Sequence, residues 1–372
     1  MKKHIVIGAG ILGASTAYHL AKSGEEVVLI DSNENGQATD AAAGIVCPWL
    51  SQRRNRAWYT LAKEGARYYP ELINMLEADG ESNTGYKRVG AISIRKEEKK
   101  LQAMEERALK RREHAPEIGE ITRLSPQEAK AMFPPLAEGF GAIHVSGAAR
   151  VDGRLLRNAL QQAAIKHGAT YIKGNAKLLL ADDIVTAIEV NEQTIQTDNI
   201  IITAGVWAKQ LLKAIHVDFN VDAQKAQITH LQLPDMDTSN WPVVMPPSDH
   251  YLLAFDDSKI VAGATHENDV GLDYRVTPVG LQEIFSKALD IAPDLANSTV
   301  METRVGFRPV TPGFLPVIGA LPGHENLFIA NGLGSSGLTT GPFIGSQLAK
   351  LAQGEDAVID LESYPVSGAI GN

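Results

Sequence analysis

The N-terminal segment contains two apolar runs on either side of a segment with helical character. Residues 4–7 (HIVI) form a short apolar run, which predicts a buried strand. Helix-forming residues follow over 11–23, and a second apolar run at 26–30 ends at Asp31. Together these segments predict a β-turn-α-β unit of about thirty residues, which is how a dinucleotide-binding Rossmann fold begins.

The rest of the chain continues to alternate between helical and extended patterns. Helices are predicted over 57–78, Lys96–His114, 125–133, 152–167, 278–291 and 340–352, with a further helix starting near Val206. Strands are predicted over 169–173, 177–181, 184–190, 200–203 and 327–330. The stretch 219–305 is expected to mix short strands and turns around its helix. No repeat or linker separates these segments, so the fold is predicted to be assembled from discontinuous pieces.

The high density of charge over Lys96–His114 distinguishes this predicted helix from the others. We interpret it as a solvated surface element without a functional role, because charge runs of this kind usually face water.

The loop between the first strand and the first helix is Gly8-Ala9-Gly10-Ile11-Leu12-Gly13. Gly8 permits a tight turn, Gly10 lets the backbone approach a diphosphate, and Gly13 lets the helix pack closely on the strand. The helix N-terminus then offers free N–H groups to the phosphates. Asp31 can accept hydrogen bonds from ribose hydroxyls and would repel the 2′-phosphate of NADP. Such loops serve NAD as well as FAD, and the flanking strand and helix disfavour a turn without a ligand.

Composition narrows the setting in which the protein works. A net charge of −9 over 372 residues argues against nucleic-acid binding. The single cysteine, Cys47, allows no internal disulfide and no cysteine metal cluster, so we expect a cytoplasmic protein without a metal site. Lys2-Lys3 followed by the apolar run Ile5–Ala14 imitates a signal peptide, but the glycine spacing favours the dinucleotide loop. No apolar stretch reaches the roughly 18–20 residues of a transmembrane segment.

Further motifs decide between the two dinucleotides. They are Ala38–Ile45 (ATDAAAGI), Ile200–Trp207 (IIITAGVW), Gly306–Pro309 (GFRP) and the tail Asn331–Gly341. With the glycine loop, and in this order, they resemble the FAD-dependent D-amino-acid oxidase (DAO) superfamily over nearly the whole chain. Within it the chain is most similar to bacterial members that are glycine-oxidase-like or D-amino-acid-dehydrogenase-like.

The resemblance implies an α/β fold with two domains. A Rossmann-type FAD-binding domain would be assembled from residues 1–80, 151–218 and 304–372. An α+β substrate domain, built on a mainly antiparallel sheet, would comprise residues 81–150 and 219–303.

The resemblance also implies a set of residues that bind FAD. The stretch Thr39–Ile45 is expected along the flavin, Ala176 beside the adenine, and Ala204–Trp207 near the ribose and diphosphate. The amides of the loop 332–337 are expected at the flavin N1–C2=O edge, where a helix N-terminus favours the reduced state. The predicted cofactor-binding residues are Gly8, Gly10, Ile11, Leu12, Gly13, Asp31, Ser32, Thr39, Ala43, Gly44, Ile45, Ala176, Ala204, Gly205, Trp207, Arg308, Gly332, Leu333, Gly334, Ser335, Ser336 and Gly337.

Two residues are predicted to bind the substrate. The family's arginine in the G-x-R-P motif, here Arg308, would bind a carboxylate bidentately. Tyr251 aligns with a tyrosine that adds a hydrogen bond to the same carboxylate. Residues with weaker support are Trp49, His250 and His266 near the substrate, and Arg304, for which a structural role is an alternative.

Two departures from the covalently flavinylated sarcosine-oxidase branch change the expected chemistry. That branch attaches its flavin through a cysteine late in the chain, and none exists here, so FAD is expected to bind non-covalently; Cys47 is interpreted as a small buried residue. The same branch places an oxygen-activating lysine where this chain has Val261. Fast reaction with oxygen is therefore in doubt, and oxygen or another electron acceptor stays open.

The predicted activity is oxidation of a small amine that bears a carboxylate. Hydride transfer to flavin N5 would give an imine, and hydrolysis would give a keto acid. The motifs fit several substrates: glycine, an N-alkyl amino acid, a D-amino acid, proline and a glycated amino acid. They leave the oligomeric state open, so the protein could be a monomer or a homo-oligomer. The alternatives are a 2-hydroxy acid or polyol-phosphate dehydrogenase, a non-catalytic flavin-binding protein, and an NAD dehydrogenase.

Overall fold

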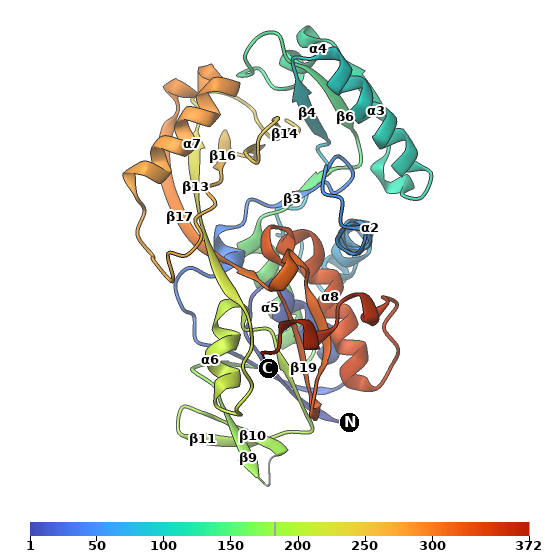
Figure 1. Ribbon diagram of the computed structural model, residues 1–372, viewed down its shortest axis with the longest axis vertical. Helices are drawn as coiled ribbons and strands as arrows, with labels where there is room; N and C mark the ends of the chain where they lie inside the picture. The colour runs from blue at the N-terminus through green and yellow to red at the C-terminus, as the bar shows by residue number, and fades with distance from the viewer. Residues whose placement is uncertain (182–183, 372) are drawn as a thin grey trace.

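The computed structural model describes residues 1–181 and 184–371 and contains two principal sheets (Figure 1). The first, called here the parallel sheet, is parallel except for its β18–β19 pair. Its spatial order is β18 (Val317–Leu321), β19 (His324–Asn331), β12 (Asn199–Ile202), β1 (Lys3–Ile7), β2 (Glu26–Asp31) and β8 (Thr170–Lys173). The strands β1, β2, β8, β12 and β19 confirm the extended segments expected from the apolar runs.

Four helices pack together in the half of the molecule that contains the parallel sheet. They are α1 (Ile11–Lys22), α2 (Arg56–Ala78), α5 (Gly153–Lys166) and α8 (Gly337–Gln353). All agree with the predicted helices to within a few residues. The side chain of Asp152 accepts hydrogen bonds from the amides of Arg154 and Leu155, and so caps α5. Both chain termini lie in this lower half of Figure 1.

The second sheet, called here the antiparallel sheet, forms the upper half of Figure 1 and is antiparallel except for its β14–β4 pair. Its order is β17 (Thr299–Val310), β13 (Asp222–Gln232), β16 (Lys259–Gly263), β15 (Tyr251–Ala254), β14 (Val243–Met245), β4 (Ala91–Arg95), β6 (Gly141–Val145) and β5 (Ile121–Leu124). The helices α7 (Pro278–Ile291), α3 (Glu98–Arg112) and α4 (Pro126–Met132) accompany it. A capping box formed by Ser125 and Glu128 starts α4, which lies within the helix predicted over 125–133.

The remaining elements are short. They comprise β3 (Ile45–Val46), β7 (Ala149–Arg150), β9 (Lys177–Ala181), β10 (Ile184–Val190), β11 (Gln193–Gln196) and α6 (Ala208–Lys213). Short 3₁₀ helices are η1 (Ala38–Ala41), η2 (Pro116–Ile118), η3 (Gly205–Trp207), η4 (Pro293–Asn297), η5 (Pro312–Phe314), η6 (Gly334–Ser336), η7 (Leu361–Ser363) and η8 (Val366–Ala369). The two-domain division stays a proposal; its boundary at residue 304 falls inside β17.

The expectation of short strands over 219–305 is wrong for two of its strands. β13 has 11 residues and β17, which begins at Thr299, has 12. The sequence hid β13 because polar side chains occupy its buried positions, among them Lys225 and Gln227. Lys225 is paired with Asp273 at 3.0 Å, and the Gln227 side chain donates to Glu267 at 2.7 Å. Since these partners come from elsewhere in the chain, the apolar pattern alone could not reveal the strand.

Candidate active site

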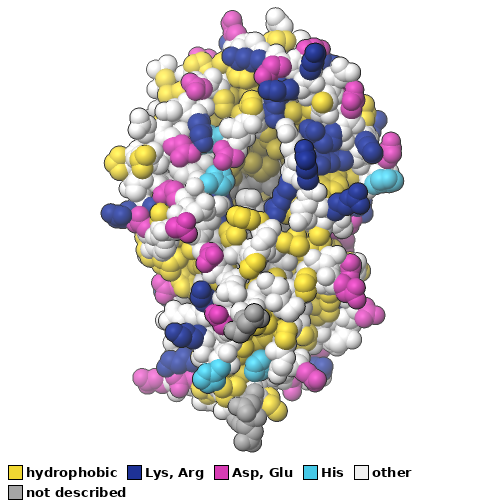
Figure 2. Space-filling view, in the orientation of Figure 1, with side chains coloured by type: hydrophobic (Ala, Val, Ile, Leu, Met, Phe, Trp, Pro, Cys, Tyr) yellow, Lys and Arg dark blue, Asp and Glu magenta, His cyan; other side chains and the backbone are white. Residues whose placement is uncertain are grey.

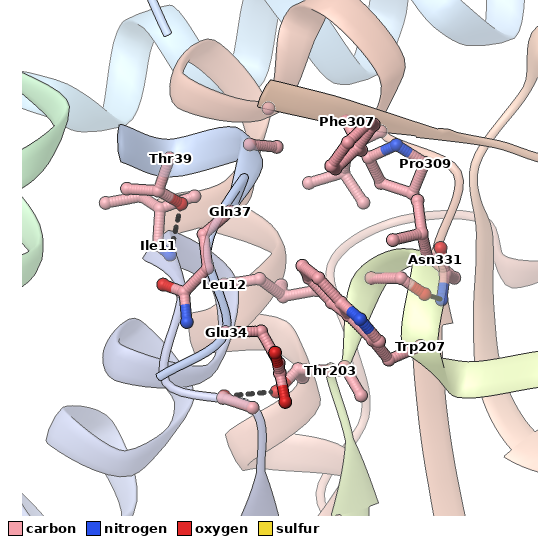
Figure 3. A pocket seen from close by; sticks show the side chains of 18 of the residues that line it. Ile11, Leu12, Glu34, Gln37, Thr39, Thr203, Trp207, Phe307, Pro309 and Asn331 are labelled. Carbon is pink, nitrogen blue, oxygen red and sulfur yellow. Dashed lines mark hydrogen bonds between the residues drawn. The ribbon is translucent and has the colours of Figure 1, made fainter. Parts of the chain in front are cut away.

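A cavity of about 710 Å³ lies where the two sheets meet. The residues that follow β1, β2, β8 and β12 line one part of it, so it opens at the carboxyl ends of the parallel strands. This is where ligands bind in open parallel sheets. Residues of β13, β15 and β17 line another part. Figure 3 shows Glu34 and Gln37 on one side of the cavity and Trp207, Pro309 and Asn331 on the other.

The glycines of the β1–α1 loop have separate physical roles. Gly8 has φ = +100°, and a Cβ there would lie 2.6 Å from the carbonyl oxygen of Thr203. A Cβ on Gly13 would overlap the carbonyl oxygen of Gly8. At Gly10 the nearest atom is Thr39 Oγ1, 3.3 Å from the added Cβ. Gly8 and Gly13 therefore let the chain pack on itself, whereas Gly10 leaves space in front of the loop.

The N-terminus of α1 fits a diphosphate. It carries no acidic residue in its first turn and no side-chain cap from Gly10. Two of its neighbouring amides are held by the chain: Ala9 N donates to Asp31 Oδ2 at 2.6 Å and Ile11 N donates to Thr39 Oγ1 at 3.0 Å. These bonds fix the loop while the positive end of the helix dipole lies at the cavity.

Asp31 accepts several hydrogen bonds from the chain itself. Besides the Ala9 amide, the Asn33 amide donates to it at 2.6 Å and Gln37 Nε2 at 2.8 Å. A carboxylate has about four acceptor sites, so one remains for a ribose hydroxyl. The predicted ribose contact of Asp31 stays a prediction, and Glu34 and Gln37 lie beside it in the cavity wall.

Most of the predicted cofactor-binding residues line this one cavity, although they come from distant parts of the chain. They are Gly8, Gly10, Ile11, Leu12, Asp31, Ser32, Thr39, Ala43, Gly44, Ile45, Ala176, Ala204, Gly205, Trp207, Arg308, Leu333, Gly334, Ser335 and Gly337. Their individual contacts with a cofactor stay predictions.

Three further predicted residues support the wall instead. Gly13 packs on Gly8, and Gly332 has φ = +76° and leaves room for Thr311. Ser336 Oγ accepts a hydrogen bond from Trp58 Nε1 at 2.9 Å.

Sequence reasoning missed two residues that hold the loops together. Thr203 Oγ1 lies 3.0 Å from the carbonyl oxygen of Ile7 and 2.8 Å from that of Gly8, and so ties the end of β12 to the glycine loop. Asn331 Nδ2 donates to Gly205 O at 2.9 Å, and its Oδ1 accepts from the Gly332 amide at 2.7 Å. Each residue lies within a recognised motif, Thr203 in Ile200–Trp207 and Asn331 at the start of Asn331–Gly341, and that position was the only available signal.

Arg308 lines the cavity from β17. Its Nη1 donates to Gln224 Oε1 at 3.1 Å and to Thr265 O at 3.3 Å. Both acceptors are neutral, and among the described residues no carboxylate lies within ion-pair distance of this guanidinium. Burial lowers the pKa of Arg308, but a guanidinium remains charged in proteins. The positive charge is therefore free for an anionic ligand.

Tyr251 lines the same cavity from β15. Burial raises the pKa of its hydroxyl to about 12, against the opposing effect of the Arg308 charge. Gly263, the neighbour of Tyr251 across the β15–β16 pair, makes room for the ring, since a Cβ there would lie 2.7 Å from the tyrosine oxygen. The Tyr251 hydroxyl is thus a neutral hydrogen-bond donor near a fixed cation.

The residues with weaker support for a place near the substrate are either buried in the protein or paired with a charged side chain. Trp49 is buried and packs in the core. His250 is buried, and burial lowers its pKa to about 4. His266 Nδ1 lies 3.2 Å from Asp249, forming a histidine–carboxylate pair that sequence analysis did not find. The Arg304 side chain is paired with Glu302 and donates to Asp40 O, which bears out its structural alternative.

Cys47 is buried, and burial raises the pKa of its thiol to about 12. It is therefore a packing residue and not a thiolate at neutral pH. Among the described residues, no helix is long and apolar enough to cross a membrane.

Comparison with known proteins agrees with this architecture. Residues 3–351 match the DAO family, described as FAD dependent oxidoreductase. An uncharacterized oxidoreductase, YurR, from Bacillus subtilis is 61% identical over the full length of both chains. The crystal structure of iminodiacetate oxidase from Chelativorans sp. BNC1 is 47% identical, has a TM-score of 0.94 and covers 97% of this chain and 98% of that one. Glycine oxidase from Pseudomonas aeruginosa is 29% identical over 98% of this chain and 99% of its own.

These matches confirm FAD as the cofactor and the predicted fold class. The glycine loop, the uncapped helix N-terminus and the small residues at 43–44 and 204–205 fit a dinucleotide that the backbone approaches closely.

The different roles of two loop glycines can be separated by substitution. Gly10→Ala is expected to change the thermal unfolding of the apoprotein little, because its Cβ would meet only Thr39 Oγ1, at 3.3 Å, and no backbone atom. It is expected to weaken FAD binding by about tenfold or more. Gly13→Ala is expected to destabilise the apoprotein by about 1–3 kcal/mol, because its Cβ overlaps the Gly8 carbonyl. Visible flavin absorbance per chain and thermal unfolding measure the two effects. A Gly10→Ala protein that retains full FAD affinity would contradict the assigned role.

Proposed function

Because the chain belongs to the DAO family of FAD-dependent oxidoreductases, we propose that it oxidises the CH–NH bond of a small amino acid. The observation that carries this proposal is the position of Arg308 and Tyr251 in the same cavity as the dinucleotide loop. A guanidinium without a carboxylate partner is suited to a substrate carboxylate, which it can bind through two parallel hydrogen bonds.

In this proposal the chain positions the substrate and controls its surroundings. Arg308 binds the carboxylate and Tyr251 donates a second hydrogen bond to it, so that the carbon next to the carboxylate is held in one orientation. The strands that carry these residues are paired through β13 and β16, which makes the two donors part of one rigid sheet. The cost of orienting the reactants is therefore met when the substrate binds.

Bound FAD supplies the two-electron acceptor for the reaction. The substrate amine must be unprotonated, because its lone pair becomes part of the C=N bond. The resulting imine is hydrolysed by water to a 2-oxo acid and ammonia, or an amine where the substrate nitrogen was substituted. No strong base is required in this scheme, since the proton on the nitrogen is lost to solvent before the C–H bond breaks.

We propose N-substituted amino acids as the first substrates to test. The support is the 47% identity to an iminodiacetate oxidase, whose named substrate is a secondary amine with two carboxylates. Glycine is the next class, since a relative of 29% identity is a glycine oxidase. A cytoplasmic location is part of the proposal and follows from the single cysteine.

The decisive experiment is an anaerobic screen that follows loss of the flavin's visible absorbance. Iminodiacetate, sarcosine, glycine, proline and D-alanine are compared with lactate and glycerol 3-phosphate, and reduced enzyme is then exposed to air. Reduction by amines alone supports the proposal, and the rate of re-oxidation decides between oxygen and another acceptor. Reduction only by the hydroxylated compounds, or by none of the panel, would overturn it.

Removal of the Arg308 charge tests the carboxylate site. Arg308→Ala is expected to raise KM for the active amino acid by about tenfold to a hundredfold, the worth of a charged hydrogen bond. FAD content should stay near one per chain. Lys259→Ala is the matched control, because it removes one positive charge from β16 of the same sheet at an exposed position. If steady-state kinetics show an unchanged KM in Arg308→Ala, this residue does not bind the substrate carboxylate.

The pH dependence of the reaction separates the substrate amine from Tyr251. We expect kcat/KM to rise with pH until the substrate amine is deprotonated. Since the pKa of Tyr251 is raised to about 12, its hydroxyl stays protonated throughout this range and contributes no ionisation. Tyr251→Phe should raise KM by up to about tenfold and leave the shape of the profile unchanged. A profile that loses an ionisation in Tyr251→Phe would show that the tyrosine itself titrates.

A further inference from the structure

A second cavity, of about 480 Å³, lies between the start of α2 and the surface helix α3. Arg53, Arg54 and Arg56 line it from the segment that leads into α2, and Arg107 and Arg111 line it from α3. No aspartate or glutamate is among its lining residues in the described part of the chain. Although the whole chain carries a net charge of −9, this cavity is strongly positive. Figure 2 shows Lys and Arg side chains gathered on the α3 side of the upper half.

Two of these arginines maintain the shape of the cavity. Arg111 Nη1 donates to Trp49 O at 2.6 Å and to Ser51 O at 2.7 Å, and its guanidinium lies 4.4 Å from the centre of the Tyr59 ring. Arg53 donates to the carbonyl oxygen of Phe314 and lies 4.9 Å from the centre of the Trp58 ring. Their hydrogen bonds join α3, the segment 49–58 and η5 into one wall.

The other three arginines are available to a ligand. Within the described residues, Arg54, Arg56 and Arg107 form no ion pair and no hydrogen bond to a protein acceptor. Arg107 Nε is buried without a hydrogen-bond partner, and so is the hydroxyl of Tyr59, which also lines the cavity. Native structures rarely leave buried polar atoms without hydrogen-bond partners, because the lost hydrogen bonds to water are not replaced.

Nearby carboxylates do not neutralise this charge. Glu64 and Glu117 are acidic groups near this part of α2, and both are paired with Arg67, at 3.1 and 3.4 Å. The start of α2 adds the positive end of a helix of 23 residues to the same cavity. The local excess of positive charge therefore persists after every observed ion pair is counted.

We propose that this cavity binds a small oxyanion ligand with two or more carboxylate or phosphate groups. Three free guanidiniums around one cavity favour several negative groups on one molecule, because each planar guanidinium can bind an oxyanion bidentately. The two cavities share no lining residue in the described chain, so the anion is a ligand separate from the substrate bound at Arg308. This proposal does not depend on which amine is oxidised.

The test is calorimetric titration of the FAD-loaded protein at constant ionic strength. Citrate, pyrophosphate and inorganic phosphate are the probes, sodium chloride is the reference, and polyglutamate represents an acidic macromolecule. We expect saturable binding of one or more of the multivalent small anions. The result would also show whether carboxylate or phosphate groups are preferred. Binding of polyglutamate but of no small anion, or of nothing in the panel, would overturn the proposal.

Three single substitutions locate the binding. Arg107→Gln and Arg54→Gln are each expected to lower the affinity for the anion by about tenfold or more. Arg112→Gln is the matched control, since it removes the same charge from α3 at an exposed position outside the cavity. Arg54 is also exposed, so Arg54→Gln keeps the test valid if Arg107→Gln fails to fold. An equal loss of affinity in Arg112→Gln would show that the anion is attracted only by the overall positive charge of α3.

Discussion

The close packing of the β1–α1 loop against the end of β12 is the constraint on which the candidate active site depends. Gly8 and Gly13 remove the side chains that would separate strand from helix, and Thr203 fixes the loop by hydrogen bonds to Ile7 and Gly8. The N-terminus of α1 is thereby held at the carboxyl edge of the parallel sheet, where Asn331 joins the neighbouring loops. The backbone amides and the helix dipole at this edge fit a diphosphate.

In the proposed function, the charge that recognises the substrate comes from the antiparallel sheet. Several arginines here are paired with carboxylates, as Arg150 is with Asp256. Arg308 differs because its partners are neutral and it lines the main cavity. The same strand pair buries Lys225 with Asp273, so neutralised and free cations lie on adjacent strands. Pairing with a carboxylate, more than position, distinguishes a structural cation from one that can bind a ligand.

The charged helix α3 shows the limit of a charge-run argument. Its pattern correctly predicts a surface helix, and Leu101, Met104 and Ala108 provide its narrow buried face. Two of its arginines nevertheless turn towards the segment 49–56, where they meet three more. Solvated charge and an anion-binding wall look identical in sequence, because the difference lies in which distant residues stand opposite.

The sequence by itself determined the Rossmann unit and most helices, because these depend on short-range periodicity and on glycine positions within one loop. The family and the residues around the main cavity came from the resemblance of several motifs along the chain to the DAO superfamily. Only the tertiary structure revealed β13 and β17 at full length, the His266–Asp249 pair and the arginine-lined cavity. In each of these cases a polar side chain acquires its role from a partner far along the chain. Local patterns record which residues avoid water, whereas the pairing of buried polar groups is fixed only when the chain has folded.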